Sequence, residues 1–371
     1  MSKIKIIVGP KSYLQSFLNF NFISLEDYVI KTESLIRNIV YKVNEEDYKN
    51  LLENKFILAK TESYSAINEE ALNNFIHYIQ QSIKYGEGIY LQNPPKLIIN
   101  QIKSSFDCDE YEIFKYQYPK TDLQVLKDIN YKTSNQILGQ DTSIHRILAS
   151  MYKLTKTSKK PIVLMFYGPS GVGKTEISKI ISECLGGKLL RKQMSMNKTN
   201  YMFDYIFGNK HGKSSLAKDL LERESNVILL DEFDKGLSEI NSAFYQLFDE
   251  GVFEDSHYEV DMSNSLIICT ANYDEENEIR NDLGDPIYYR FNDLIKFQPL
   301  NVNTKEKIVK RIVEKEFNNL SDEERNLLPD SEDLLKKYMK WVEQFTNYRH
   351  IEKIIELDIN MILVNALIIE Y

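Results

Sequence analysis

The sequence predicts an α/β fold in which a parallel sheet is sandwiched by helices, with a small α/β domain before it and a helical lid after it. From Asn135 onward, short apolar runs alternate with turns and helical stretches, which is typical of a parallel sheet covered on both faces. The runs at residues 162–166, 227–230 and 266–270 are continuously apolar, as expected for strands buried on both sides. After Pro299 the pattern is helical throughout, which predicts the lid.

The N-terminal third has a different pattern and is predicted to form a separate small α/β domain, residues 1–120. Three β-rich runs at 4–8, 56–59 and 88–91 alternate with helical stretches such as 67–85, and no catalytic pattern occurs among them.

The boundaries of the remaining segments follow from composition and from helix signals. Residues 121–134 are polar with weak periodicity, so we interpret them as a linker or docking helix. Residues 135–300 then form the large domain and residues 301–371 the lid, whose first helix is expected to open with a capping pair of Asn303 and Glu306.

Composition bounds the class of protein and its partners. The 371 residues, 43% of them hydrophobic, can bury at least one full core and favour two or three domains. The net charge of −9 repels a phosphate backbone, which disfavours nucleic acid as a partner. The N-terminal apolar run is too short for a signal peptide, and no uncharged run reaches about 18 residues. We therefore expect a cytoplasmic protein without a membrane partner.

A glycine-rich loop follows the first predicted strand of the large domain and matches the GxxxxGK[ST] phosphate loop. A buried strand precedes it and an amphipathic helix follows, which is the context that a P-loop NTPase requires, so a chance glycine-rich turn is disfavoured. Backbone N–H groups would surround the β-phosphate, Lys174 would bridge the β- and γ-phosphates, and the Thr175 hydroxyl would bind Mg²⁺. The residues expected to contact the nucleotide here are Gly168, Pro169, Ser170, Gly171, Val172, Gly173, Lys174, Thr175 and Glu176.

Two carboxylates, Asp231 and Glu232, end the second buried strand of the large domain. Ligands of open α/β sheets bind at the carboxyl ends of such strands. Asp231 would hold Mg²⁺, directly or through water, and Glu232 would polarise the water that attacks the γ-phosphate. An acidic pair after a strand is otherwise usually a helix cap and a solvated neighbour, but the phosphate loop in the same sheet favours the catalytic interpretation.

Asn272 follows the third buried strand and would reach the same edge of the sheet, where its amide could orient the attacking water. An asparagine after a strand is otherwise most often a turn residue, so this assignment depends on the two motifs before it.

The order of phosphate loop, Asp-Glu-Phe-Asp-Lys and Thr-Ala-Asn-Tyr resembles the Clp branch of AAA+ ATPases over residues 135–371. The resemblance implies that Ile137 and Leu138 lie against the adenine. Residues 248–255 and 258–261 look like the hairpin that precedes the third strand motif in this family, although their alternation would also suit any hairpin.

Two arginines gain roles only through this resemblance. Arg290 stands where the family has an arginine finger that acts in trans across a subunit interface, although its proline is one residue nearer than usual. Arg349 stands where a lid arginine contacts the nucleotide, although the usual Gly-Ala before it is missing. The alternative for either arginine is a surface salt bridge.

Two aromatic residues between the phosphate loop and the acidic pair resemble the Clp pore loop, which grips a translocating polypeptide. Phe207 is the better match and Tyr205 the second, but the family's Gly-aromatic-Val-Gly is not intact. The alternative is that both are packing residues.

The resemblance therefore implies an ATP- and Mg²⁺-dependent ATPase. It would form a homo-oligomeric ring, expected to be a hexamer, and would remodel or unfold a protein partner chosen by the N-terminal domain. A nucleotide-switched assembly scaffold with slow hydrolysis is the alternative from another class. A DNA-remodelling ring is a third option that the net charge disfavours.

Overall fold

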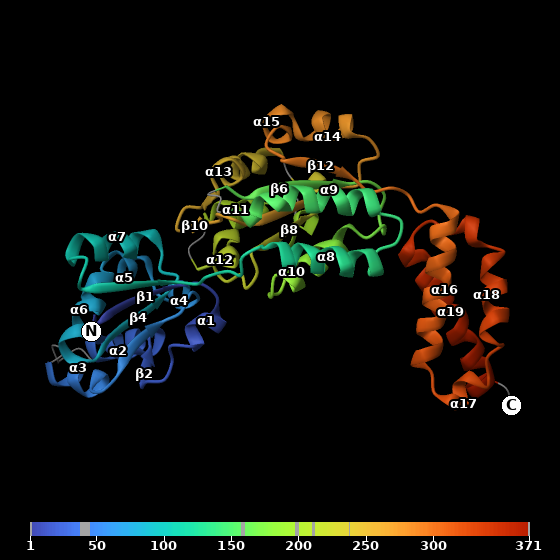
Figure 1. The fold of residues 1–371 in the computed structure, drawn as a ribbon. Coiled ribbons are helices and arrows are strands. Elements are labelled where there is room, and N and C mark those ends of the chain that lie inside the picture. The colour runs from blue at the N-terminus through green and yellow to red at the C-terminus, as the bar shows by residue number, and fades with distance from the viewer. Residues whose placement is uncertain are drawn as a thin grey trace.

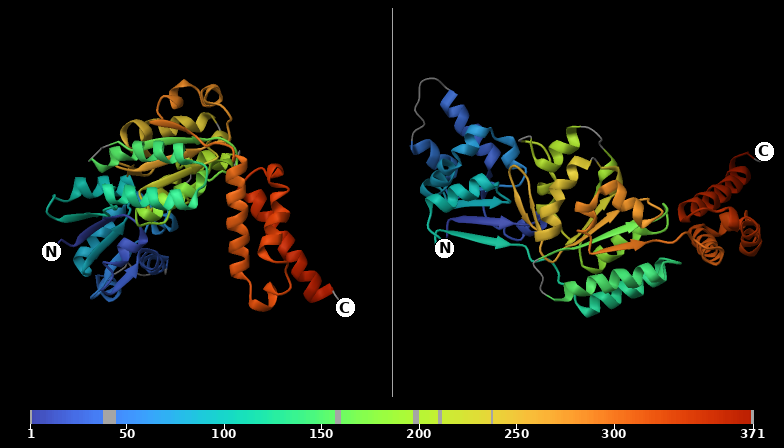
Figure 2. Two further views of the ribbon diagram at one scale, coloured as in Figure 1. Left: turned by 45° about the vertical axis from the view of Figure 1, so that its right-hand side comes forward. Right: turned by 90° about the horizontal axis from the view of Figure 1, so that it is seen from above.

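The computed structural model describes residues 2–37, 45–156, 160–196, 200–209, 212–236 and 238–369. It contains two α/β domains and a helical lid, which follow one another along the molecule (Figure 1). The lid helices form a separate group that follows the second sheet through a segment near Pro299 that is neither helix nor strand (Figure 2).

The N-terminal domain is built on a five-stranded sheet in the order β2-β3-β4-β1-β5, and every neighbouring pair in it is parallel. The strands are β1 (Ile4–Val8), β2 (Phe22–Ser24), β3 (Phe56–Ala59), β4 (Gly88–Gln92) and β5 (Tyr111–Lys115). The helices are α1 (Lys11–Gln15), α2 (Leu25–Arg37), α3 (Glu45–Leu52), α4 (Ser63–Ala66), α5 (Glu69–Asn73), α6 (Phe75–Tyr85) and α7 (Lys96–Ser105). The predicted small α/β domain is confirmed.

The single helix expected over residues 67–85 is wrong, because the chain forms two helices there. Asn68 caps α5 by accepting a hydrogen bond from the Ala71 N–H, and Asn74 then leaves helical geometry with φ −106° and ψ 25° before α6 begins. Asparagine is a poor residue for a helix interior because its side chain competes for backbone groups, which explains a break at this position.

The large domain holds a second five-stranded parallel sheet in the order β12-β6-β11-β8-β7. The strands are β6 (Ile162–Tyr167), β7 (Leu190–Gln193), β8 (Val227–Asp231), β11 (Leu266–Thr270) and β12 (Asp293–Lys296). All residues of β6, β8 and β11 are buried. The three predicted central strands are therefore confirmed, with β6 and β8 one residue longer than expected.

Helices cover both faces of this sheet because alternate strand residues enter two different cores. One face packs against α8 (Leu123–Gln136), α9 (Asp141–Met151) and α10 (Lys174–Cys184). The other packs against α11 (Asn200–Phe207), α12 (Leu216–Leu221), α13 (Tyr245–Glu250), α14 (Glu276–Leu283) and α15 (Asp285–Tyr288). The stretch interpreted as a linker or docking helix thus forms α8, which places Leu126 and Ile129 in the core of the large domain.

The smaller elements complete the description. The expected hairpin is confirmed as an antiparallel pair of β9 (Val252–Glu254) and β10 (Glu259–Asp261). Short 3₁₀ segments are η1 (Tyr152–Thr155), η2 (Met194–Met196), η3 (Phe233–Lys235), η4 (Ser238–Phe244) and η5 (Val342–Gln344), and a π turn, η6, covers Asn365–Ile369.

The lid is all-helical, as predicted, and has its own apolar core. Its helices are α16 (Val302–Asn319), α17 (Asp322–Arg325), α18 (Ser331–Met339) and α19 (Tyr348–Val364). The cap predicted from Asn303 and Glu306 is wrong, because the side chain of Asn301 accepts the hydrogen bond of the Thr304 N–H at 2.8 Å. Asn301 is the last residue in an extended conformation, so its side chain and not that of Asn303 faces the free N–H groups of the first turn. Among the described helices, none combines the length and apolarity needed to cross a membrane.

Candidate nucleotide site

The phosphate loop runs from the end of β6 to the start of α10 and depends on glycine at three positions. Gly168, Gly171 and Gly173 have φ values of 124°, 72° and 108°, which favour glycine. A Cβ atom on Gly168 would lie 2.3 Å from the carbonyl oxygen of Phe297. Another residue there would displace the loop, so the curled backbone that a phosphate requires depends on glycine.

Lys174 begins α10 and lies under this loop with only 8% of its surface exposed. Its Nζ donates to the carbonyl oxygens of Gly168 at 2.5 Å and Pro169 at 2.9 Å, and to Asn272 Oδ1 at 3.2 Å. Burial lowers the pKa of the ammonium to about 8, against the opposing effect of Asp231 and Asp234. The amine thus remains largely protonated at neutral pH, and an anionic ligand would stabilise its charged form further.

Asp231 is buried at the end of β8 and is held by residues from both neighbouring strands. Its Oδ2 forms an ion pair with Arg191 of β7, with Nη2 at 2.5 Å and Nε at 2.8 Å. Its Oδ1 accepts a hydrogen bond from the Thr270 hydroxyl at the end of β11. Two fixed carboxylate oxygens facing the edge of the sheet suit a hard divalent cation such as Mg²⁺.

Glu232 has a left-handed backbone, with φ 54°, and turns its side chain toward β7. Its N–H donates to the Thr270 hydroxyl at 3.0 Å, and its carboxylate accepts hydrogen bonds from Gln193 at 2.9 Å and from Ser195. These two side-chain hydrogen bonds hold the pKa of the carboxyl below its usual value. The positive φ of a non-glycine residue is strained backbone, and here it directs the carboxylate along the sheet edge.

The loop, the acidic pair and Asn272 meet because β11 pairs in parallel with both β6 and β8. The bond between Lys174 and Asn272 joins the first and third motifs directly, and Thr270 joins the third motif to Asp231. The convergence of Lys174, Asp231, Glu232 and Asn272 at one edge is therefore present in the structure.

The remaining residues of the loop differ in exposure. Val172 is buried, Thr175 is half-buried at the start of α10, and Ser170 is exposed. Glu176 is also exposed and pairs with Lys179 one turn later at 3.0 Å, so its expected contact with nucleotide stays a prediction.

The lid reaches the phosphate loop through the start of α19. The Tyr348 N–H donates to the Gly171 carbonyl at 3.3 Å, and a Cβ atom on Gly171 would lie 2.9 Å from the Asn347 side chain. Arg349 is exposed beside them and near enough to Lys174 to lower its pKa. Arg349 therefore lies at the mouth of the site, where its role as a lid contact remains a prediction.

Ile137 and Leu138 bridge the large domain and the lid. Ile137 is buried in the core of the large domain, with its Cγ2 only 3.2 Å from the position of a Cβ on Gly173. Leu138 packs against the lid core. The apolar side chains of Ile137 and Leu138 lie next to the loop, where they would suit the flat face of a base. The adenine contact stays a prediction.

Arg290 lies after α15, where its Nε pairs with Asp249 at 2.7 Å and its guanidinium lies 4.4 Å from the centre of the Tyr245 ring. No contact with Lys174 or Asp231 of its own chain is present among the described side chains. A role in trans stays a prediction.

Both aromatics of the expected pore loop lie in α11 and pack against the large-domain core. The Tyr205 hydroxyl donates to Asp219, and burial together with that carboxylate raises the pKa of the phenol. The centres of the Phe207 and Phe203 rings lie 4.3 Å apart with the ring planes tilted by 39°, and Phe203 is itself 40% exposed. The packing alternative thus accounts for Tyr205 and Phe207 in this conformation, and a role in gripping substrate stays a prediction.

Several residues of the site were missed from the sequence. Arg191 and Gln193 lie on the edge strand β7, whose sequence Leu-Arg-Lys-Gln has no apolar alternation that would have marked it as a strand. Ser195, Thr270 and Asn347 carry no signal of their own, because their importance comes from partners distant in the chain.

Known proteins resemble the chain in both sequence and fold. The family model for the AAA domain (Cdc48 subfamily) matches residues 159–326. The chaperone protein ClpB of Chlamydia pneumoniae is 25% identical over 316 residues, which are 78% of this chain and 35% of that protein. A ClpA homologue of Fuscovulum blasticum is 29% identical over 177 residues, or 44% of this chain and 22% of that protein. The chain thus spans about a third or less of these relatives.

A solved structure extends the likeness in fold to nearly the whole chain. The closed state of Hsp104 with ATPγS and FITC-casein aligns with 98% of this chain and 88% of its own, with a TM-score of 0.55 and 14% identity. At this identity the likeness concerns the fold alone. The site geometry, the family match and these relatives agree: residues 159–326 match the AAA domain, and the chain is similar in sequence to the Clp-type AAA+ ATPases.

Proposed function

We propose that this chain binds ATP at the edge of its second sheet, hydrolyses it with Mg²⁺, and uses the cycle within a homo-oligomeric ring, a hexamer, to remodel or unfold a protein partner. The observation that carries the proposal is the 3.2 Å bond between Lys174 and Asn272, which joins the phosphate loop to the polar end of the neighbouring strand. A triphosphate bound at this edge of the sheet would therefore lie near the Lys174 ammonium, the Asn272 amide and two carboxylates.

Binding would begin with exchange of partners at Lys174. Its ammonium is bonded to two loop carbonyls, and an anionic phosphate oxygen is a stronger acceptor than either. The loop N–H groups between Gly168 and Gly173 and the free N–H groups that open α10 would then hold the β-phosphate.

The metal would be held between Thr175 and Asp231. Asp231 would have to exchange its ion pair with Arg191 for the cation, which an adjacent divalent charge favours. When bound, Mg²⁺ neutralises charge on the β- and γ-phosphates.

Hydrolysis requires Glu232 to receive a proton from water. Because hydrogen bonds from Gln193 and Ser195 hold its pKa low, the carboxylate is ionised at neutral pH and is available as an acceptor. Those same bonds must loosen for it to face the phosphate, which gives the chain a means to delay hydrolysis. Asn272 would orient the water and Arg349 would contact the nucleotide from the lid.

Support for the proposed ring comes from Arg290, whose described partners, Asp249 and Tyr245, lie outside its own chain's nucleotide site. We expect Arg290→Ala to keep ATP binding and to lose about 10³-fold in turnover, since a finger stabilises charge only in the transition state. Steady-state ATPase assays and equilibrium binding measure the two quantities. Arg280→Ala, which removes an exposed arginine paired with Asp285, is the control and should retain turnover.

Mixing variants tests action in trans. A Lys174→Ala subunit still carries Arg290, and an Arg290→Ala subunit still carries an intact phosphate loop. Mixed rings should therefore regain turnover that neither variant has alone. If all mixing ratios stay inactive, Arg290 does not act across an interface.

Protein remodelling needs a side chain that contacts the partner, and α11 offers the exposed Phe203 with the half-buried Phe207 beside it. We expect Phe203→Ala and Phe207→Ala to abolish the stimulation of turnover by an unfolded protein such as casein, with basal turnover unchanged, because the two rings lie in contact, with their centres 4.3 Å apart. Tyr131→Ala removes an aromatic that is 73% exposed on α8 and should change neither rate. Stimulation that persists in both phenylalanine variants would remove α11 from substrate contact.

A nucleotide-switched assembly scaffold is the second candidate. The observation in its favour is that Glu232 is bonded to Gln193 and Ser195 while Tyr205 is held by Asp219. Slow turnover with no response to unfolded protein, together with ATP-dependent assembly, would identify it.

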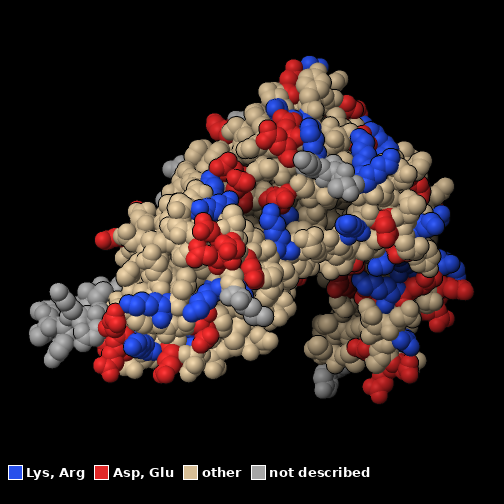
Figure 3. Space-filling model, turned by 60° about the vertical axis from the view of Figure 1, so that its left-hand side comes forward, with Lys and Arg blue, Asp and Glu red and all other residues tan. Residues whose placement is uncertain are grey.

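A DNA-remodelling ring remains disfavoured. Acidic and basic side chains are interspersed on the face shown in Figure 3, without a broad basic surface there, and the chain carries a net charge of −9. A cytoplasmic location is part of the same proposal, in keeping with an ATP-dependent protein that acts on other proteins.

A further inference from the structure

The two sheets have the same strand order. The strands of each five-stranded sheet can be numbered from one to five in chain order. The N-terminal sheet then has the order 2-3-4-1-5, and the large-domain sheet, read from β7 to β12, has the same order. All of these neighbours are parallel. By position, β1 therefore corresponds to β6, β3 to β8, and β4 to β11.

Corresponding loops carry related residues. Gly9-Pro10-Lys11-Ser12 follows β1, whereas Gly168-Pro169 and Lys174-Thr175 frame the phosphate loop after β6. Asn93 follows β4, and Asn272 follows β11. In both domains this asparagine bonds to the element after the first strand, since Asn93 Nδ2 donates to the Gly9 carbonyl at 3.0 Å and Asn272 accepts from Lys174.

The loop after β1 is too short to hold a phosphate. Two residues separate β1 from α1, whereas six separate β6 from α10. Pro10 has no N–H, and the Gly9 N–H already donates to Asn93 Oδ1 at 2.9 Å. The backbone donors that surround a phosphate in the second domain have therefore no counterpart in the first.

A carboxylate from the large domain lies at this edge instead. Glu222, at the end of α12, accepts hydrogen bonds from the Lys11 N–H at 2.9 Å, from Gln92 at 3.0 Å and from Asn93 at 3.3 Å. The Thr61 hydroxyl, which follows β3, donates to the same side chain. Thr61, Gln92 and Asn93 are all more than nine-tenths buried, so these donors face Glu222 and not solvent.

We infer that the N-terminal domain is a second copy of the nucleotide-domain fold that binds no nucleotide, and that Glu222 fills its former phosphate position and docks the two domains. The donors come from the ends of β3 and β4 and from the start of α1, the same three places that form the ATP edge of the large domain. A negative oxygen on those donors is the chemistry that a phosphate would otherwise supply.

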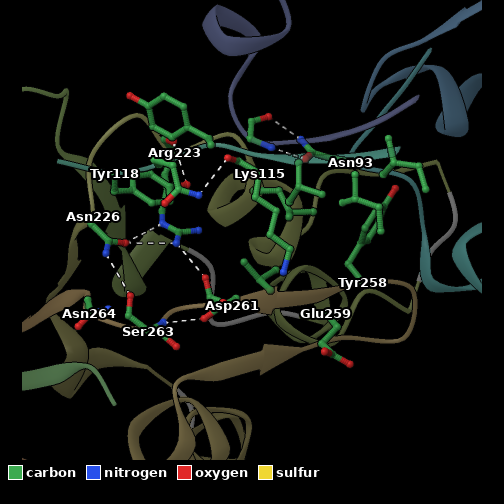
Figure 4. Close-up of a pocket in the computed structure, with 18 of the residues that line it drawn as sticks. Asn93, Lys115, Tyr118, Arg223, Asn226, Tyr258, Glu259, Asp261, Ser263 and Asn264 are labelled. Atoms are coloured by element: carbon green, nitrogen blue, oxygen red, sulfur yellow. Dashed lines mark hydrogen bonds between the residues drawn. The ribbon is translucent and has the colours of Figure 1, made fainter. Parts of the chain in front are cut away.

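The surrounding interface supports docking. Lys218 of α12 donates to Ser65 at 2.7 Å, and Lys96 forms an ion pair with Glu254 at 2.5 Å. Arg223, next to Glu222, is buried 4.3 Å from the centre of the Tyr118 ring and donates to the Asp261 carbonyl at 2.9 Å. Arg223 and Tyr118 border a cavity of about 650 Å³ between the domains, with Asn93 on its N-terminal side and Tyr258 on the other (Figure 4).

Glu222 is also close along the chain to the strand that carries the acidic pair of the ATP site. Glu222 and Arg223 lie shortly before β8, which begins at Val227 and ends in Asp231. If β8 shifts when Asp231 and Glu232 change their partners, Glu222 would move with it and would alter its contacts with the N-terminal domain.

Hydrogen exchange of the full chain without nucleotide tests the docking, and it does not depend on the proposed hydrolysis. In Glu222→Ala the Lys11 amide should exchange at least about tenfold faster, and amides of residues 116–122, between the domains, should lose protection. Amides of β6 and β11 should stay protected. The control is Glu224→Ala, an exposed glutamate two residues along, which should match the wild type.

A second variant guards against a folding defect. Glu222→Gln has the same shape, but its NH₂ group must face one of the donors, so faster exchange at the same amides should appear in smaller measure. Unchanged exchange at residues 9–12 and 116–122 in both variants would overturn the docking role.

Photolabelling with an azido-ATP tests the absence of a nucleotide site. Labelled peptides should come from residues 135–371 alone. A label within residues 1–120 would overturn the inference. No label anywhere would count against the proposed function, and the exchange experiment would still decide the docking.

Discussion

Lys174→Ala is expected to weaken ATP binding by about 100-fold or more, because the variant loses a charge-assisted contact to two phosphates. The buried ammonium has no substitute in the loop, since Lys174 is the only basic residue among residues 168–175. Titration with a fluorescent ATP analogue measures the change. Lys179→Ala, on the same helix but exposed and paired with Glu176, is the matched control and should bind normally.

The same lysine predicts a pH dependence. Burial lowers its pKa from 10.5 to about 8, so the fraction of charged ammonium in the free protein falls as pH rises through 8. ATP affinity should therefore decrease above that pH in the wild type. Between about pH 8 and 10.5, Lys174 is more often protonated in the unfolded chain than in the folded chain. The free energy of unfolding therefore rises with pH across that range. Affinity that is flat from pH 7 to 9 would contradict a phosphate contact by Lys174.

Glu232→Gln is expected to bind ATP as the wild type does and to lose 10²- to 10⁴-fold in turnover, the usual worth of a positioned general base. The amide keeps the size of the side chain and can still accept from Gln193 or Ser195, so the edge of the sheet should stay intact. Single-turnover hydrolysis and ATP binding are the measurements.

The trapped state should also assemble more strongly, because ATP would remain bound at the proposed subunit interface. Glu224→Gln, distant from the pocket residues and exposed, should behave as the wild type in both assays. Turnover retained in full by Glu232→Gln would refute its role. The trapped protein also offers a means to recover the partner, since what stays bound to it can be identified.

The sequence was sufficient where a function resides in adjacent residues. The phosphate loop is one continuous segment whose glycines determine its backbone and whose lysine opens the following helix. The three central strands were recognisable because burial on both faces requires continuous apolar runs. The helix boundaries were less accurate, as Asn74 and Asn301 show, because a cap depends on which side chain faces the free N–H groups.

Pairs that are distant in the chain were beyond the sequence. Asp231 is bonded to Arg191 forty residues earlier and to Thr270 thirty-nine residues later. The sequence around an acidic residue does not indicate whether distant partners of this kind will bind it. Similarly, the sequence left segment 121–134 open between a linker and a docking helix, and the packing of α8 against the sheet decided for the helix.

By itself, the sequence determined that one domain carries a phosphate loop, an acidic pair and a polar amide on three buried strands, because these are local patterns of residue type. Only the tertiary structure decided that Glu232 faces Gln193 and Ser195, and that Glu222 lies at the edge of the first sheet, 161 residues from Thr61. Strand order brings such residues together, and strand order is set by the packing of the whole chain, which no short segment encodes.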